Sequence, residues 1–236
     1  MKNGLLIMLV LTAAVTTRAQ KVIEKHMPLS ANGFVSMNFQ ISDSIRIIMW
    51  NKNEVYVKST IDVNDNQNND DYKEAFDEAA TSVNITGKLH TNCNNYRRRK
   101  RAADSAHRSN DDDDNCCSCN CGCETNIVHE VYIPENTDFS VETINGNIII
   151  SGNAAGIRAK SISGYIDLTM APQKAAALRM QTISGTMYSN FDLGGTNGLR
   201  RQVGGRTVDA QLNGSGGKAV DLETISGDIF FRKQGS

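Results

Sequence analysis

Four segments in the second half of the chain share one pattern of hydrophobic and polar positions. In each, apolar residues alternate with polar ones, an Ile and a Ser-Gly or Asn-Gly pair follow, and the alternation then resumes. The central residues Ile144, Ile162, Ile183 and Ile225 are spaced by 18, 21 and 42 residues. A period of about 20 residues is typical of stacked-repeat proteins, whose units bury their apolar faces against one another. Because the last spacing is twice the one before it, we expect a degenerate copy between the last two.

Each copy predicts two strands that face one interior, because period-two alternation gives a strand one buried and one exposed face. The parity changes at the central Ile: Thr143 continues the first series, whereas Ile144 begins the second. The chain therefore has to bend there. Gly adopts positive φ without penalty, and Asn or Ser can close a local turn. We expect structural corners at four pairs of residues: Asn145 and Gly146, Ser163 and Gly164, Ser184 and Gly185, and Ser226 and Gly227.

Two architectures fit these corners. Asn-Gly between alternating strands is also a hairpin signal, and four hairpins would give a meander. A coil of parallel strands better explains why the same corner returns, and it would stack four hydroxyl residues in a ladder: Thr143, Ser161, Thr182 and Thr224. We therefore predict an all-β fold, a single-chain parallel β-solenoid (β-helix-like) over residues 127–233.

The solenoid makes detailed predictions. Successive anchors Ile144, Ile162 and Ile183 should be neighbours, and Ile162→Asp should unfold the array by burying a charge. Residues 206–212 should form the strand of the degenerate copy. Three inward columns are expected: Phe139/Ile157/Leu178/Val220, Val141/Ala159/Met180/Leu222 and Ile148/Ile166/Met187/Ile229.

The chain before the repeat predicts a β-rich part over residues 20–90, either irregular solenoid turns or a cap. Ser42-Asp43-Ser44 loosely resembles the later corners. Residues 72–80 are compatible with two helical turns, because Tyr72, Ala75 and Phe76 would share one face.

Residues 1–19 have the features of a secretory signal peptide. Lys2 precedes an apolar stretch over 5–15, and Thr17-Arg18-Ala19 provides a small-x-small cleavage site. We expect an exported protein, periplasmic or secreted to the cell surface, without membrane insertion. A formal net charge of −1 gives no indication of nucleic-acid binding.

Residues 91–126 predict a disordered insertion, because a basic run at 97–101 and an acidic run at 111–114 replace large apolar residues. Three interpretations of its cysteines remain open: disulfides, a soft-metal site aided by His90, His107 or His129, and a low-complexity segment. All six cysteines lie in this insertion: Cys93, Cys116, Cys117, Cys119, Cys121 and Cys123.

Catalysis needs converging groups, and none of the four histidines lies in a repeated or glycine-framed motif. The outward residues of the four copies vary in sign, as on a solvated face: Glu142, Lys160, Gln181 and Glu223. We therefore expect no enzyme, no catalytic residues, no metal site and no cofactor.

The repeated Thr-Ile-Ser-Gly-Asp-Ile turns, the strand at Tyr132-Ile133-Pro134 and the closing segment 212–232 resemble the bacterial putative-adhesin family of exported β-solenoid proteins. That family is a domain of unknown function, so the resemblance implies architecture and no catalytic residues. It favours an exported, non-enzymatic scaffold that contacts a protein or glycan surface. The alternative is a soft-metal-binding or redox-sensitive envelope protein acting through Cys116–Cys123. A polysaccharide-active solenoid enzyme is a third possibility.

Overall fold

The computed structural model describes residues 20–30, 32–90, 124–193, 200–202, 205–214 and 216–235. The signal-peptide segment and all six cysteines lie outside these residues. The described chain is all-β, with one 3-10 turn η1 (Asn69–Asp71). Its strands are β1 (Lys21–Pro28), β2 (Phe34–Trp50), β3 (Glu54–Val63), β4 (Tyr72–Ala79), β5 (Ser82–Leu89), β6 (Thr125–Pro134), β7 (Asp138–Ser151), β8 (Ile157–Ser163), β9 (Ile166–Met170), β10 (Ala176–Ser184), β11 (Met187–Ser189), β12 (Arg200–Gln202), β13 (Gly205–Leu212), β14 (Lys218–Ser226) and β15 (Ile229–Lys233).

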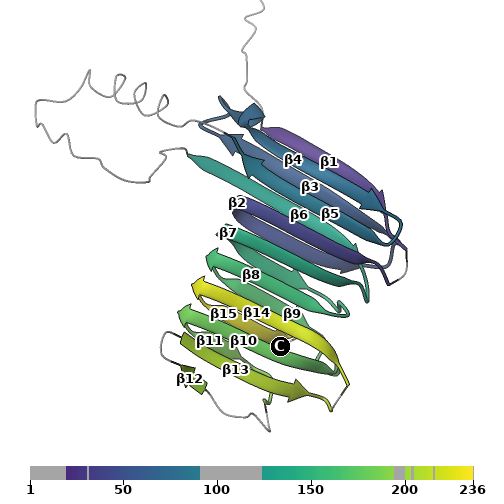
Figure 1. Ribbon diagram of the computed structural model, residues 1–236, viewed down its shortest axis with the longest axis vertical. Coiled ribbons are helices and arrows are strands. Elements are labelled where there is room, and N and C mark those ends of the chain that lie inside the picture. The colour runs from purple at the N-terminus through teal and green to yellow at the C-terminus, as the bar shows by residue number, and fades with distance from the viewer. Residues whose placement is uncertain are drawn as a thin grey trace, which may run out of the picture.

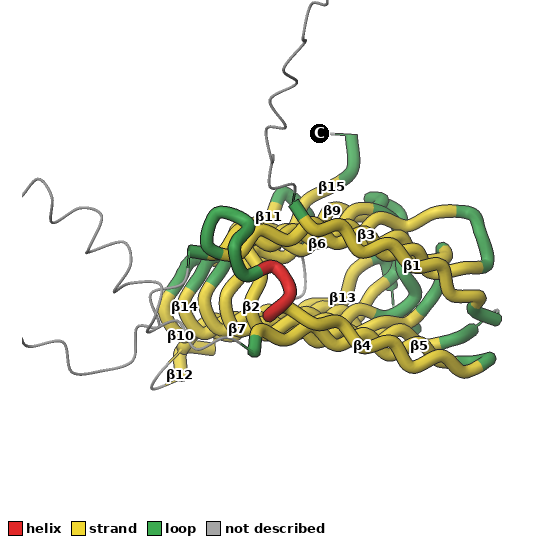
Figure 2. Tube along the Cα trace, turned by 90° about the horizontal axis from the view of Figure 1, so that it is seen from above, coloured by secondary structure: helices red, strands yellow, loops and turns green. Residues whose placement is uncertain are grey.

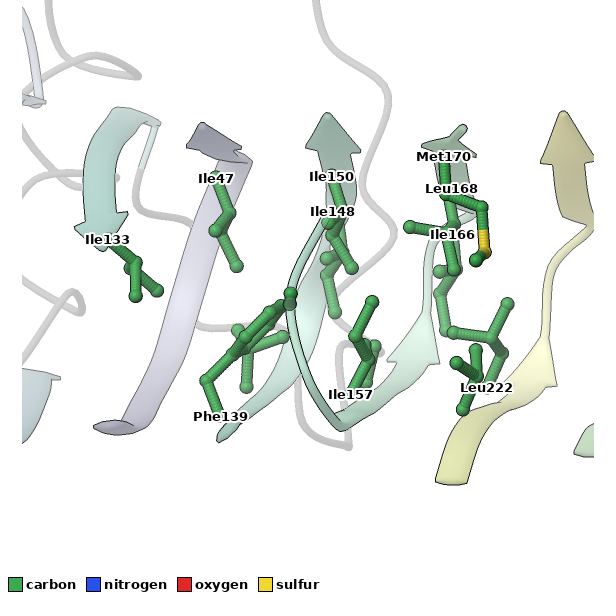
Figure 3. Close-up of a cluster of buried hydrophobic side chains, with 14 of the residues drawn as sticks. Ile47, Ile133, Phe139, Ile148, Ile150, Ile157, Ile166, Leu168, Met170 and Leu222 are labelled. Carbon is green, nitrogen blue, oxygen red and sulfur yellow. The ribbon is translucent and has the colours of Figure 1, made fainter. Parts of the chain in front are cut away.

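The strands form an open, mostly parallel sheet folded into two layers (Figures 1 and 2). The long strands β2 and β7 bend and contribute one half to each layer. Their first halves lie beside β5 and β8, and their second halves lie beside β6 and β9. Side chains from both layers meet between them and form the core (Figure 3).

We call the two strand segments on either side of one corner a coil: the two halves of β7, β8 with β9, β10 with β11, and β14 with β15. The spatial order of these coils differs from their order in the chain. We expected Ile162 and Ile183 on neighbouring coils, but β14 lies between β8 and β10, and β15 lies between β9 and β11. All four pairings are parallel. The last coil of the chain is thus inserted between the second and the third, and the prediction of coils stacked in chain order was wrong.

The predicted inward columns are confirmed. Along the first column, the spatial order is Phe139, Ile157, Val220 and Leu178, and all four side chains are buried. The other two columns are also buried, apart from the half-buried Met187 at the end of the stack. The residues of every column therefore still point into the core, although the last coil is inserted out of chain order.

The strand of the degenerate copy is also present. Residues 205–212 form β13, and its residues Val208, Ala210 and Leu212 are buried. However, β13 runs antiparallel to β10 and pairs with β12 on its other side, so it does not repeat the coil.

Residues 72–80 do not form the two helical turns that their spacing permitted. Residues 72–79 form β4, antiparallel to β5, with Tyr72 buried. Tyr72 and Phe76 are four residues apart, which fits both the helical period of 3.6 residues and the strand period of two. Pairing with β5 decides in favour of the strand. No helix in the described part of the chain is long and apolar enough to span a membrane.

Candidate functional site

The predicted corners stack into one column along the edge where the two layers meet. The hydroxyl residues before the corners point inward; Thr143 bonds to the Asn145 carbonyl of its own corner, and the other three bond to the neighbouring coil. Ser161 Oγ donates to the Gly146 carbonyl at 3.0 Å, and Thr224 Oγ1 donates to the Gly164 carbonyl at 3.2 Å. Thr182 Oγ1 continues the series to the Gly227 carbonyl at 3.1 Å. The ladder gives the glycine carbonyls of three corners a side-chain hydrogen-bond donor.

The glycines of the corners are required by close packing of the backbone. A Cβ on Gly164 would collide with the Gly146 carbonyl, one on Gly227 with the Gly164 carbonyl, and one on Gly185 with the Gly227 carbonyl. The column extends toward the N-terminus, because a Cβ on Gly146 would lie 2.5 Å from the Ser42 carbonyl oxygen. The resemblance of Ser42-Asp43-Ser44 to the later corners therefore has a structural basis.

The central isoleucines face solvent, contrary to expectation. Ile144, Ile162, Ile183 and Ile225 are 44%, 38%, 51% and 36% exposed. The parity changes because two consecutive residues at each bend, the Ile and the Ser or Asn after it, both point outward. A buried Ile162 was therefore a wrong prediction, and so was its consequence that Ile162→Asp would unfold the array.

These isoleucines form a continuous apolar line, which we call the isoleucine ridge: Ile144, Ile162, Ile225 and Ile183, in spatial order. Neighbouring positions follow from the register of the adjoining corners. Next to them, Asn145, Ser163, Ser226 and Ser184 form a parallel line of exposed polar side chains. An apolar line beside a hydrogen-bonding line is therefore presented along one edge of the molecule.

The outer face of the first layer carries alternating charges. One row runs from Arg158 through Asp221 and Arg179 to Asp209, each residue opposite the next. In the next row, Lys160 Nζ lies 3.2 Å from Glu223 Oε1. This face is a solvated, charge-balanced surface, in agreement with the varied signs in the sequence.

A polar cluster is buried between the layers near the N-terminus. His129 of β6 is fully buried and stacks on Phe39 at 3.9 Å between ring centroids. A 2.7 Å hydrogen bond joins its Nδ1 to Ser59 Oγ, and its Nε2 lies 3.3 Å from the Tyr72 hydroxyl. Glu74 Oε1 lies 3.4 Å from the same Nδ1. Burial, and next the Glu74 carboxylate, raise the pKa of Tyr72 above its ordinary value.

Ser59, His129 and Glu74 resemble a nucleophile, a base and an acid, but their geometry differs from a catalytic triad. In a triad, the nucleophile and the acid bind opposite nitrogens of the imidazole ring. Here Ser59 and Glu74 both approach Nδ1. The side chains of His129 and Glu74 are 0% exposed, and Ser59 is also 0% exposed. This arrangement favours a structural role, and it engages both nitrogens of a histidine that we had considered as a metal ligand.

The sequence contained signals for this cluster. His129 has the same parity as the buried residues Ile127, Val131 and Ile133. A histidine on the inward face of a strand needs buried hydrogen-bond partners. Those partners come from β3 and β4, and only the tertiary fold identifies them.

Comparison with solved structures supports the fold. A "putative cell adhesion protein" from Clostridium sporogenes matches with a TM-score of 0.53 and 8% identity, covering 91% of this chain and all of the other. A "putative adhesin" from Bacteroides fragilis aligns with 92% of this chain and 98% of the other, at a TM-score of 0.21 and 8% identity. No family model and no curated protein matches the sequence. At this identity, the first similarity concerns the fold.

Proposed function

We propose that the protein is an exported, non-enzymatic scaffold of the adhesin type that contacts a protein or glycan surface in the periplasm or at the cell surface. Its repeated part is a β-solenoid variant whose last coil is inserted out of chain order. The signal-peptide pattern supports export, and the fold shared with a protein described as a "putative cell adhesion protein" supports the adhesin type. The fully buried Ser59, His129 and Glu74 cluster supports a non-enzymatic role.

The observation that carries the proposal is the isoleucine ridge. Four apolar side chains, each more than a third exposed, repeat at the spacing of adjacent strands, about 4.8 Å. Contiguous exposed apolar residues are typical of interaction surfaces. The ridge is rigid, because its corners are held by hydroxyl–carbonyl hydrogen bonds between coils. A rigid surface loses little conformational entropy on binding.

Replacing the centre of the ridge should weaken adhesion. We expect Ile162→Ser combined with Ile225→Ser to reduce binding of the mature protein to immobilised collagen, fibronectin or mucin at least fivefold. Surface plasmon resonance on these three ligands measures the change. Val22→Ser is the matched control, because Val22 is 50% exposed on the edge strand β1. It should bind like the unmodified protein.

Two results would contradict the proposal. One is unchanged binding after both ridge substitutions, with thermal unfolding showing that the variant is folded. The other is turnover of a polysaccharide by the purified protein. A variant lacking residues 91–126 tests the alternative, since loss of binding in that variant assigns adhesion to the cysteine-rich segment.

A further inference from the structure

A hollow lies on the outer face of the first layer, away from the isoleucine ridge. Its volume is about 470 Å³, within the range of roughly 300–1,000 Å³ that small-molecule sites occupy. It extends across the beginnings of four neighbouring strands, β2, β7, β8 and β14. It is lined by small, apolar and charged residues: Ser140, Gly156 and Ala219; Phe34, Phe139 and Ile157; and Asp138, Glu142, Arg158, Lys218 and Asp221.

Phe34 gives the hollow an apolar wall. Its side chain is 43% exposed, unusual for a residue of this size in a chain with few aromatics. Tertiary packing in the protein therefore leaves much of the ring uncovered. An exposed aromatic ring beside small residues offers a flat surface on which the C–H face of a ligand can stack.

Asp138 contributes a partly exposed carboxylate to the hollow. Its Oδ2 binds Lys218 Nζ at 2.9 Å, reaching across β8 at Gly156. Its Oδ1 is buried and has no hydrogen-bond partner among the described residues. A Cβ at position 156 would lie 2.8 Å from this oxygen, so the glycine lets the carboxylate pack directly against the backbone. The exposed part of this carboxylate, whose side chain is 40% exposed, can accept a hydrogen bond from a ligand hydroxyl.

The charges of the hollow select the class of ligand. Three carboxylates, Asp138, Glu142 and Asp221, oppose a phosphate or another strongly anionic group. Two cations, Arg158 and Lys218, disfavour a cationic ligand. Each lies near a carboxylate: Lys218 is paired with Asp138, and Arg158 Nε lies 3.9 Å from Asp221 Oδ2. A neutral polyhydroxyl ligand fits, because its hydroxyls donate to carboxylates and accept from cations.

We infer that this hollow binds a neutral saccharide unit, with its C–H face on Phe34 and a hydroxyl donating to the exposed part of the Asp138 carboxylate. This inference rests on the proposed function and assigns the glycan contact to a site separate from the ridge. The insertion of β14 assembles the site, because Lys218 and Asp221 reach it only from a strand adjacent to β8.

Titration calorimetry of the mature protein with cellohexaose, maltohexaose and chitohexaose tests the inference, with hexagalacturonate as the acidic comparator. At least one neutral hexasaccharide should bind, and Phe34→Ala should weaken it tenfold or more. Phe34→Trp should retain binding, and Val22→Ala, at an exposed position on the other layer, should leave it unchanged. Thermal unfolding of each variant verifies that it is folded.

The inference is overturned if none of the neutral probes binds, if hexagalacturonate binds most tightly, or if Phe34→Ala binds as well as the unmodified protein. These results are independent of the ridge experiment. Ridge-dependent adhesion without saccharide binding would reject only the saccharide site. Saccharide binding, together with adhesion that is unchanged by the ridge substitutions, would reject only the proposal that the isoleucine ridge mediates adhesion.

Discussion

A Leu222→Asp variant is expected to lose the cooperative unfolding transition of the stack. Leu222 is fully buried in β14, between β8 and β10. Among the described strands, β10 and β11 reach the rest of the sheet only through β14 and β15. An unpaired buried carboxylate there costs upwards of about 4 kcal/mol, a large part of a typical domain stability of about 5–15 kcal/mol. Urea unfolding followed by circular dichroism measures the loss.

Ile225→Asp is the matched control for this experiment. It places the same charge on the same strand, but at a position 36% exposed on the isoleucine ridge. We expect a change of about 1 kcal/mol or less, because a surface charge remains hydrated. Equal destabilisation by the two substitutions would contradict the assignment of inward and outward faces.

Gly227→Ala is expected to reduce the free energy of unfolding by about 2–4 kcal/mol. The added methyl group would collide with the backbone carbonyl of Gly164, which cannot move without breaking the corner column. The same carbonyl accepts the hydrogen bond from Thr224, so the clash also disturbs the ladder. Thermal unfolding detects the change. Ser226→Ala, one residue earlier and exposed, should change stability by about 0.5 kcal/mol or less, and a tolerated Gly227→Ala would refute the close approach.

The strands, the corners and the inward columns follow from the sequence, because each depends on local alternation and on the freedom of glycine. The outward position of the isoleucines does not. Ile162 has the parity of the second buried series, but a convex bend turns the residue at its apex toward solvent. Hydrophobic identity alone cannot distinguish an apex from an interior position.

The order of the coils is a long-range property, and the spacing of the repeats pointed to the wrong order. The charged residues at matching positions of the repeats indicate the correct order. In chain order, Arg158 would lie opposite Arg179, and like charges on opposite residues are destabilising. Inserting Asp221 between them gives alternating signs, and Asp209 on β13 continues the alternation. Matching charges between repeats could therefore have identified the inserted coil.

The position of the last coil orders the ridge and assembles the hollow at Phe34. Disulfide formation can report this position in a chain whose six cysteines are replaced by serine. Ser226 adjoins both Ser163 and Ser184, whereas those two serines are separated by an intervening strand, about 9.6 Å at the usual strand spacing and beyond disulfide reach. We predict that Ser163→Cys with Ser226→Cys forms an intramolecular disulfide on mild oxidation, and that Ser163→Cys with Ser184→Cys does not. Cross-linking of the second pair and not the first would show coils stacked in chain order and contradict the prediction.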